Sequence, residues 1–431
     1  MKELFQKNGI AHILAISGLH ISFIGMTLFK LLQQLQLPKL LTFVISETTI
    51  ILYVIMVGFS PSSFRALFMF SLFLLSKLLK RSYDMITALG TAGILLLLEQ
   101  PMYLFDCAFL LSFLAIAGIG VFCKRFTNLI YHPPKYTNGF FSSLFVFLTT
   151  LPVMLYFYFE ISFLSIFLNL IVIPLMSVLL VSGILLLFLD GITILCVLPA
   201  GVVSLILLIY KTCCVHLERF DMGRYNLGRP HVIQIVIYYI LFILSCYLPC
   251  KKKKTVFVTF VFLACFILFT KVQNGIDIYM IDVGQGDSCV IINENRNVYM
   301  IDGGSSSKTN IGKRRIIPFL NSRGIGTIEA VFLSHPDSDH INGIQEILEN
   351  ATREQIHINT IYILDGTKKE YENIVELARK NRTEISGIRR GFRIEDKSLV
   401  LNCIYPKTPD YIDSLNNSSL IMDIEYHDFH M

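Results

Sequence analysis

The stretch at residues 329–343 is EAVFLSHPDSDHING, an apolar run followed at once by His335, Asp337, Asp339 and His340. The apolar residues predict a strand, and the polar residues follow its end at positions i, i+2, i+4 and i+5. Such a strand-end loop places several ligands in one small volume. Imidazole nitrogen and carboxylate oxygen suit Zn²⁺ or Mn²⁺ at a hydrolytic centre. The alternative is a solvated acidic loop, but the strand before and the helix after favour a metal site.

The sequence around this stretch predicts alternating strands and helices. Residues 276–304, IDIYMIDVGQGDSCVIINENRNVYMIDGG, alternate apolar and polar positions between glycine turns and predict three short strands. We expect helices at 311–323, 341–350 and 370–381, and further strands near 329–334, 358–364 and 398–404. This order, with a ligand loop at a strand end, suggests an α/β domain built as an αββα sandwich.

The remainder of the chain has the composition of a membrane protein. Apolar residues make up 54% of the 431 and charged residues 16%, against about 25% charged in an average soluble domain. The charge gathers in residues 293–397, and the boundary falls near Lys271 to Asp277. We therefore predict a polytopic α-helical membrane domain at 1–272 and a soluble domain at 273–431.

A bilayer core about 30 Å thick needs roughly 20 mainly apolar residues per helix, which predicts nine or ten spans. Their centres are expected at 12–32, 41–59, 63–79, 85–98, 104–123, 139–159, 163–189, 192–215, 232–248 and 255–271. The seventh is either one helix or two short helices broken at Pro174, and this choice changes every orientation after it.

Lysine and arginine in short loops predict the orientation. A single seventh span puts the soluble domain on the outer face, with these basic residues in the cytoplasm: Lys77, Lys80, Arg81, Lys124, Arg125, Lys135 and Lys251–Lys254. Arg219, Arg224 and Arg229 then fall on the outer side and count against this orientation.

The ten cysteines do not suggest a disulfide framework. Eight lie in or beside apolar helices, where cysteine behaves as a small hydrophobic residue. Cys289 and Cys403 are the soluble-domain pair, and their spacing does not suit a zinc cage.

Polar residues recur inside the apolar segments. Residues 8–22, NGIAHILAISGLHIS, carry His12, Ser17 and His20. Ionisable groups are costly at bilayer depth and usually face an aqueous path or a partner. The alternative for the histidines is that they lie near the two ends of the segment and reach the interface.

Three further segments add candidate channel residues. Arg65 in GFSPSSFRA, residues 58–66, is either an interfacial anchor or a pore-lining cation. Asp106 in LFDCAFLLSF could pair with it. Asn169 begins NLIVIPL, where Pro174 frees a backbone carbonyl that needs a neighbour or water.

In combination these segments resemble the competence domain of ComEC proteins. The matching blocks are GIAHILAISGLHIS, GFSPSSFRALFM, the P-x-x-L-F-D-C-A-F-L-L-S-F run from Pro101, and NLIVIPL, in the same order. ComEC proteins are bacterial inner-membrane channels through which single-stranded DNA enters during natural transformation. DVGQGD, IDGG and S-H-x-x-x-D-H look like the metallo-β-lactamase fold found at the same place in that family.

This resemblance implies roles for the soluble-domain residues. His335 would bind one metal, and Asp339 and His340 would bind a second or orient the attacking water, so Asp339 is the expected catalytic residue. The superfamily pattern is H-x-H-x-D-H, and Asp337 stands at its middle position, where a carboxylate can still bind metal. Asp302, at a strand end, would contact a metal ligand without binding the metal itself. Asp282 and Asp287 would brace a turn.

The resemblance also implies cofactors and partners. One or two Zn or Mn ions would assist attack of water on a phosphodiester, because a metal lowers the pKa of water and neutralises phosphoryl charge. Expected partners are single-stranded DNA, the lipid bilayer of the bacterial plasma membrane, other competence-machinery proteins and a second copy in a homodimer.

Family members continue past the strand in NNSSLIMDIEYHDF, 416–429, into an L-L-T-G-D segment and an H-H-G-S segment, and they begin with further spans. We therefore expect a fragment with an incomplete hydrolase site, in which His427 and His430 are strand and terminus residues. Two alternatives stay open. One is a membrane-anchored metallohydrolase of another phosphoester, and the other is a chain whose soluble domain is non-catalytic.

Overall fold

The chain forms two compact units. A computed structural model describes residues 18–127, 137–189, 193–218, 224–247, 253–271, 273–406 and 418–431. The helical unit comprises Met1–Tyr225 and Pro230–Leu268, and the mixed unit comprises Asn226–Arg229 and Phe269–Met431. The mixed unit thus takes a short segment from between two apolar helices, which composition does not reveal.

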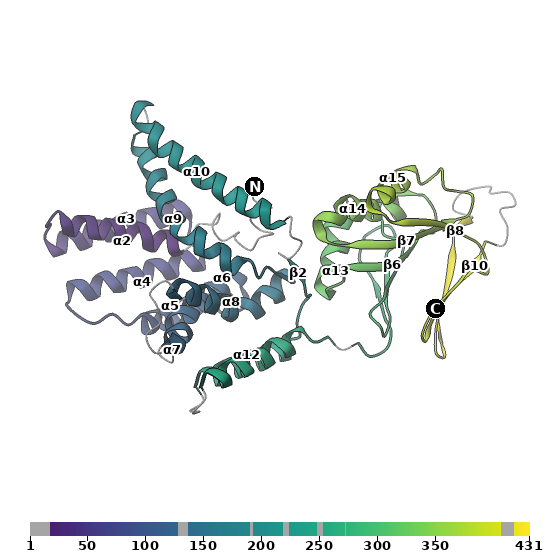
Figure 1. Cartoon of the computed structure of the whole chain (residues 1–431), viewed down its shortest axis with the longest axis horizontal. Helices are drawn as coiled ribbons and strands as arrows, with labels where there is room; N and C mark the ends of the chain where they lie inside the picture. The colour runs from purple at the N-terminus through teal and green to yellow at the C-terminus, as the bar shows by residue number, and fades with distance from the viewer. Residues whose placement is uncertain are drawn as a thin grey trace. The chain divides into compact units, whose positions relative to one another are not determined.

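Helices make up most of the helical unit (Figure 1). In its described part they are α2 (Gly18–Gln34), α3 (Lys39–Val57), α4 (Pro61–Leu78), α5 (Met85–Glu99), η2 (Pro101–Phe105), α6 (Cys107–Ala117), η3 (Gly118–Cys123), α7 (Lys124–Thr127), α8 (Thr137–Tyr158), α9 (Ser165–Phe188), α10 (Thr193–Glu218), α11 (Val232–Tyr247) and α12 (Lys253–Phe269). Two short strands accompany them, β1 (Glu160–Ile161) and β2 (Tyr225–Asn226). Each expected span has a helix at its position.

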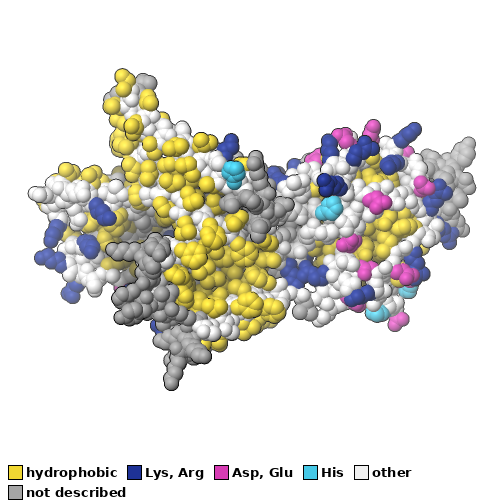
Figure 2. Space-filling view, in the orientation of Figure 1, with side chains coloured by type: hydrophobic (Ala, Val, Ile, Leu, Met, Phe, Trp, Pro, Cys, Tyr) yellow, Lys and Arg dark blue, Asp and Glu magenta, His cyan; other side chains and the backbone are white. Residues whose placement is uncertain are grey.

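Several of these helices suit a bilayer by length and composition. Five long apolar segments qualify among the described residues: Lys39–Val57, Cys107–Thr127, Thr137–Tyr158, Ser165–Phe188 and Ile194–His216. Three shorter apolar helices accompany them, Met85–Glu99, Val232–Tyr247 and Thr255–Phe269. Large hydrophobic side chains such as Met56 and Phe188 are 85% and 83% exposed, and Figure 2 shows hydrophobic side chains across this surface. In water such a surface would be unstable.

Local capping defines two of the expected polar positions. Ser60 and Ser63 form a capping box at the start of α4, with Pro61 in its first turn. Asp106 caps α6 by accepting a hydrogen bond from the Phe109 backbone N–H at 2.8 Å. Among the described residues no ion pair joins Asp106 to Arg65, and the carboxylate caps a helix instead. Pro174 lies inside α9, which continues unbroken on both sides of it.

The mixed unit contains two sheets. Six strands form the first in the order β3 (Asp277–Met280), β4 (Cys289–Ile292), β5 (Val298–Ile301), β6 (Thr327–Phe332), β7 (His357–Leu364), β8 (Glu384–Ile388). The β5–β6, β6–β7 and β7–β8 pairs are parallel. Four strands form the second in the order β12 (Phe429–His430), β11 (Ile421–Tyr426), β10 (Leu399–Tyr405), β9 (Arg393–Asp396).

Alternation along the strands builds two cores. Val290 and Val331 pack against the helix layer of η4 (Gly312–Ile316), α13 (Ile317–Arg323), α14 (Ser338–Glu354) and α15 (Glu372–Asn381). Their neighbours Ile291 and Phe332 face the second sheet instead, where they meet Leu401 and other buried residues. The described residues therefore form α, β and β layers of the expected sandwich (Figure 1). Cys289 and Cys403 are both free and buried between the sheets.

Candidate metal centre

Two neighbouring parallel strands end at the candidate site. Because β5 and β6 run in parallel, their carboxyl ends lie at the same edge of the sheet. Asp302 follows β5 directly, and His335 follows β6 after two further residues. The first turn of α14 then returns Asp339 and His340 to that edge. Sheet register, rather than sequence spacing alone, brings Asp302 to the cluster.

His335, Asp339 and His340 form the ligand group. One possible ligand atom from each lies within 4.8 Å of the others. The two imidazole rings are 3.9 Å apart between centroids. The side chains of His335 and His340 are 11% and 12% exposed, whereas that of Asp339 is 36% exposed. The two histidines are thus nearly buried, and solvent reaches the group on the side of Asp339.

Asp302 contacts the ring nitrogen of His340 that we do not assign to the metal. Its side chain is 5% exposed, and its Oδ2 lies 2.9 Å from Nδ1 of His340. Its Oδ1 accepts a hydrogen bond from the Ser334 backbone N–H at 2.8 Å. An ionised carboxylate beside Nδ1 requires that nitrogen to carry the proton, which leaves Nε2 of His340 as the ligand atom. The expected supporting position of Asp302 agrees with this geometry.

At His335, serine hydroxyl groups contact Nδ1, as the carboxylate of Asp302 does at His340. Nδ1 of His335 lies 2.9 Å from Oγ of Ser334 and 3.4 Å from Oγ of Ser419. With Nδ1 engaged, Nε2 is the atom available for a metal. Ser419 precedes β11, far along the chain from His335, so sequence spacing could not identify this contact.

The site carries an excess of negative charge. Burial is the largest influence on the pKa of His340 and lowers it, but the hydrogen bond and charge of Asp302, together with Asp339 and Asp287, outweigh burial. The pKa of His340 is therefore above its ordinary value. Burial, followed by the charges of Asp302 and two other acidic residues, likewise raises the pKa of Tyr371. Surroundings that favour a proton on histidine also favour a metal cation.

The other predicted acidic residues lie at the rim. Asp337 is at the cap position of α14, 48% exposed, with Oδ2 3.6 Å from Nε2 of His335, and it is not part of the three-residue group. The side chain of Asp287 is 67% exposed, and its Oδ2 lies 3.9 Å from Nδ1 of His340. Asp282 accepts a hydrogen bond from Lys308 at 2.8 Å, in keeping with a role in the turn.

Two glycines allow the loops to pack against the start of α14. A Cβ added at Gly286 would lie 2.4 Å from the carbonyl oxygen of Gly304, and φ of Gly286 is +145°. A Cβ added at Gly304 would lie 2.5 Å from the backbone of both Asp339 and His340. The DVGQGD and IDGG segments therefore need glycine to keep the ligand group in place.

These residues fit a divalent metal ion. Two imidazoles with engaged Nδ1 atoms and one carboxylate form a common donor set of hydrolytic metal sites. The metallo-β-lactamase fold of the unit and this donor set together indicate divalent metal binding. His335 and His340 would hold the ion through their Nε2 atoms, and Asp339 through its carboxylate.

A second group of metal-ligating side chains lies on the four-stranded sheet and was not predicted. Asp423, Glu425 and His430 bring ligand atoms within 4.8 Å of one another, because Glu425 is paired in register with His430. The His430 side chain is 61% exposed, and Glu425 accepts a hydrogen bond from Asn402 at 2.6 Å. An exposed acidic group of this kind is common without a metal, so we assign it no role.

Arg65 is buried in the helical unit and has no counter-ion among the residues that the structure describes. It is 6% exposed, and its Nε and Nη1 atoms are buried and make no hydrogen bond. Its Cζ lies 5.9 Å from the ring centroid of Phe113 on α6. A Cβ at Gly18 would lie 2.6 Å from Nη2 of Arg65, so the glycine of the first polar segment makes room for the guanidinium. Helices α2, α4 and α6 thus meet at one cation that has no acidic partner in the described part of the chain.

The positions of the remaining candidate channel residues do not indicate a role for them. His20 is buried on α2 at 6% exposure. Asn169 lies on α9, and its Oδ1 is buried without a hydrogen-bond partner. His12 and Ser17 lie outside the described residues. Asp106 serves as the α6 cap, so the structure brings the α2 segment to Arg65 but not Asp106.

Fold and site define the class: a multi-pass membrane protein that carries a metallo-β-lactamase-fold domain. The metallo-beta-lactamase superfamily pattern matches residues 281–380, which include the whole ligand group. The competence protein pattern matches residues 1–252, more than half of the chain. The chain belongs to the competence protein family.

Known relatives match along most of the chain. ComE operon protein 3 of Bacillus subtilis is 26% identical over 460 aligned residues, covering 98% of this chain and 56% of the relative. Recombination protein 2 of Haemophilus influenzae is 25% identical, covering 80% of this chain and 50% of the relative. The chain therefore spans about half the length of these relatives.

Among solved structures, the metallo-beta-lactamase fold protein YhfI from Bacillus subtilis covers 36% of this chain and 61% of its own, with 14% identity and a TM-score of 0.27.

Proposed function

We propose that this chain forms part of a channel that takes up single-stranded DNA across the bacterial plasma membrane during natural transformation, with a metal-dependent, nuclease-like domain attached. Membership of the competence protein family supports the proposal. So do the relatives named ComE operon protein 3 and Recombination protein 2.

The uncompensated Arg65 is the observation that carries the proposal. An ion removed from water costs several kcal/mol unless a partner or water compensates it. Arg65 has no carboxylate partner in the described part of the chain, although it is almost fully buried. Passage of a polyanion requires cations along its route. A guanidinium with unused donors can bind successive phosphate groups as they pass and release them again, which a paired arginine could not do.

The mixed unit would supply the hydrolytic chemistry. Zn or Mn, as one or two ions, would lower the pKa of a water molecule and neutralise charge on phosphoryl oxygens. His335 and His340 would hold the ion, and Asp302 would keep His340 in the correct tautomer. Asp339, the most exposed of the three side chains, would either complete the metal site with its carboxylate or orient the attacking water.

The proposal includes an orientation and partners. The basic loops favour a mixed unit on the outer face of the membrane, where it would meet incoming DNA. Arg224 counts against this orientation from its sequence position, but it forms an ion pair with Glu160, which reduces its weight as a topology signal. Other competence proteins and a second copy of the chain are the further proposed partners.

Replacement of Arg65 tests the proposal in the source bacterium. We expect Arg65→Gln in the chromosomal copy to lower DNA uptake on the order of tenfold or more, because a lost charge contact at low dielectric is worth well over 1.4 kcal/mol. Arg65→Lys should retain part of the activity. The measurement is internalised labelled DNA, normalised to membrane protein by immunoblot.

Arg81→Gln is the matched control, since Arg81 is exposed after the end of α4. Normal uptake by a well-expressed Arg65→Gln strain would contradict the role of Arg65 as a phosphate contact.

A further inference from the structure

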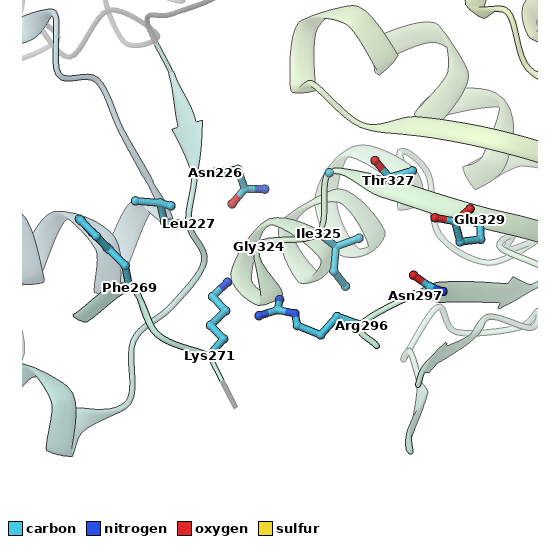
Figure 3. A pocket seen from close by; sticks show the side chains of 11 residues that line it. Asn226, Leu227, Phe269, Lys271, Arg296, Asn297, Gly324, Ile325, Thr327 and Glu329 are labelled. Carbon is cyan, nitrogen blue, oxygen red and sulfur yellow. The ribbon is translucent and has the colours of Figure 1, made fainter. Parts of the chain in front are cut away.

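Three cations of the mixed unit converge on the carboxyl end of α13. Nζ of Lys271 donates a hydrogen bond to the carbonyl oxygen of Arg323 at 2.8 Å, and Nη2 of Arg296 donates to the same oxygen at 2.9 Å. The guanidinium of Arg323 lies over the ring of Tyr279, 4.4 Å from its centroid. Figure 3 shows the head groups of Lys271 and Arg296 directed toward each other beside Gly324.

This cluster lacks negative charge. The carboxyl end of a helix supplies only about half an elementary charge, against three cations. None of the three forms an ion pair with an acidic side chain among the described residues. Burial, and then the charges of Arg296 and Arg323, lower the pKa of Lys271 to about 8. Helix capping alone therefore does not account for the cluster.

A pocket of about 460 Å³ opens beside these cations. Lys271 and Arg296 line it together with Asn297 and Thr327, while Leu227 and Phe269 add apolar surface (Figure 3). Glu329, also in the lining, accepts a hydrogen bond from Asn359 at 2.7 Å and so is engaged on another strand. The pocket thus combines two cationic donors, one carboxylate that is hydrogen-bonded to Asn359, neutral polar groups and an apolar border.

We propose that this pocket binds the phosphate headgroup of an anionic phospholipid. Phosphate oxygens would accept hydrogen bonds from Lys271 and Arg296, and Phe269 and Leu227 would contact the glycerol and the first acyl carbons. The proposal requires that α12 enters the bilayer. It does not depend on DNA uptake.

Chain connectivity favours a lipid as the occupant. Phe269 is the last residue of α12, and Lys271 is two residues further on. A helix of 17 residues is about 25 Å long, close to the thickness of the hydrocarbon core. Residues at its end therefore lie at headgroup depth, where basic side chains bind anionic lipids. A DNA phosphate offers the same oxygens, so it is the outcome that the experiment must separate.

The experiment measures the reactivity of single lysines in the full chain. The chain is placed in nanodiscs of phosphatidylcholine, with or without phosphatidylglycerol, and treated with an amine-acylating reagent near neutral pH. Peptide mass spectrometry gives the rate at Lys271 and at the exposed Lys368. We expect phosphatidylglycerol to slow acylation of Lys271 about fivefold relative to Lys368, the effect of one favourable lipid contact.

Two arginine variants localise the effect. Arg296→Gln should reduce the protection of Lys271 to less than about twofold, since the second donor is lost. Arg390→Gln removes an exposed charge outside the pocket lining and should leave the protection unchanged. Both variants are compared with the wild-type chain. The change in its Lys271 acylation rate on addition of phosphatidylglycerol already tests the proposal.

Two results would overturn it. One is an equal Lys271 rate in both kinds of nanodisc. The other is protection by a single-stranded oligonucleotide in phosphatidylcholine discs without protection by phosphatidylglycerol, which would assign the pocket to nucleic acid instead.

Discussion

At the scale of single residues, the site depends on a residue that is not a ligand. Asp302 is buried beside His340, and its two oxygens bind the imidazole and the Ser334 backbone. Removal of its charge leaves the three ligand side chains in place but no longer requires the proton on Nδ1 of His340. Groups behind a metal ligand typically contribute 10- to 100-fold to metal affinity, about as much as some ligands.

We expect Asp302→Asn to weaken Zn or Mn binding about 10- to 100-fold in the purified chain, measured by metal titration. The variant should also lower the pKa of His340, because the raised pKa depends on Asp302. Protonated His340 cannot bind metal, so the wild type loses affinity as pH falls through the raised pKa, and the variant should lose it at lower pH. Asp282→Asn, at an exposed turn, is the control. Equal affinities for Asp302→Asn and the wild type would disprove the assignment.

At the scale of elements, the expected ligand loop is partly a helix. The sequence predicts a helix over 341–350, but α14 begins at Ser338, so Asp339 and His340 lie in its first turn. Asp337 at the cap position and Asp339 in the first turn suit a helix start, and this signal was present in the sequence. The early start allows both residues to face β5 and β6. It also requires the glycine turns to approach closely.

Gly304→Ala tests the close approach. The added Cβ meets the backbone of Asp339 and His340, which cannot move as a flexible side chain would. We expect a loss of about 1–3 kcal/mol in the stability of the mixed unit, seen as faster hydrogen exchange in β6 and α14. Gly391→Ala is the control for backbone strain alone, since φ of Gly391 is +91° with open space around it. It should cost about 1–2 kcal/mol without affecting α14. Unchanged exchange in α14 of Gly304→Ala would contradict the packing argument.

At the scale of the whole molecule, surface chemistry separates the two units. The helical unit exposes large hydrophobic side chains over its long helices, whereas charged side chains of both signs are spread over the visible face of the mixed unit (Figure 2). The continuous α9 favours the single seventh span from which the outward orientation was predicted. The proposed location of the mixed unit therefore depends on how many of the helices cross the bilayer.

Reporter fusions test the orientation. We expect alkaline phosphatase joined after Asn274 to be active, because that position is proposed to lie outside the plasma membrane, and the same reporter after Arg81 to be inactive. Fluorescent-protein fusions at both positions should show the opposite pattern. An inactive phosphatase after Asn274, with fluorescence there, would place the mixed unit in the cytoplasm.

Features that depend on local pattern could be predicted from the sequence. Apolar run length located the described apolar helices, five of which are long enough to cross a membrane, and strand periodicity located β3 to β7. Three of the four side chains predicted at residues 335–340 lie together in the fold. The short strands β8 and β9 were missed because their alternation is weak, with exposed positions on both.

Contacts between residues that are far apart in the sequence could be found only in the tertiary structure. It assigned Asp106 to a helix cap, placed Arg65 beside Gly18 with no acidic partner among the described residues, and brought Ser419 to His335. It also brought Lys271 and Arg296 to the backbone carbonyl oxygen of Arg323. Hydropathy and periodicity report the average environment of neighbours in sequence, whereas these contacts depend on strand register and helix packing between distant segments. A hydrogen bond fails when its atoms move by about 1 Å, so only the folded chain determines which polar groups are paired.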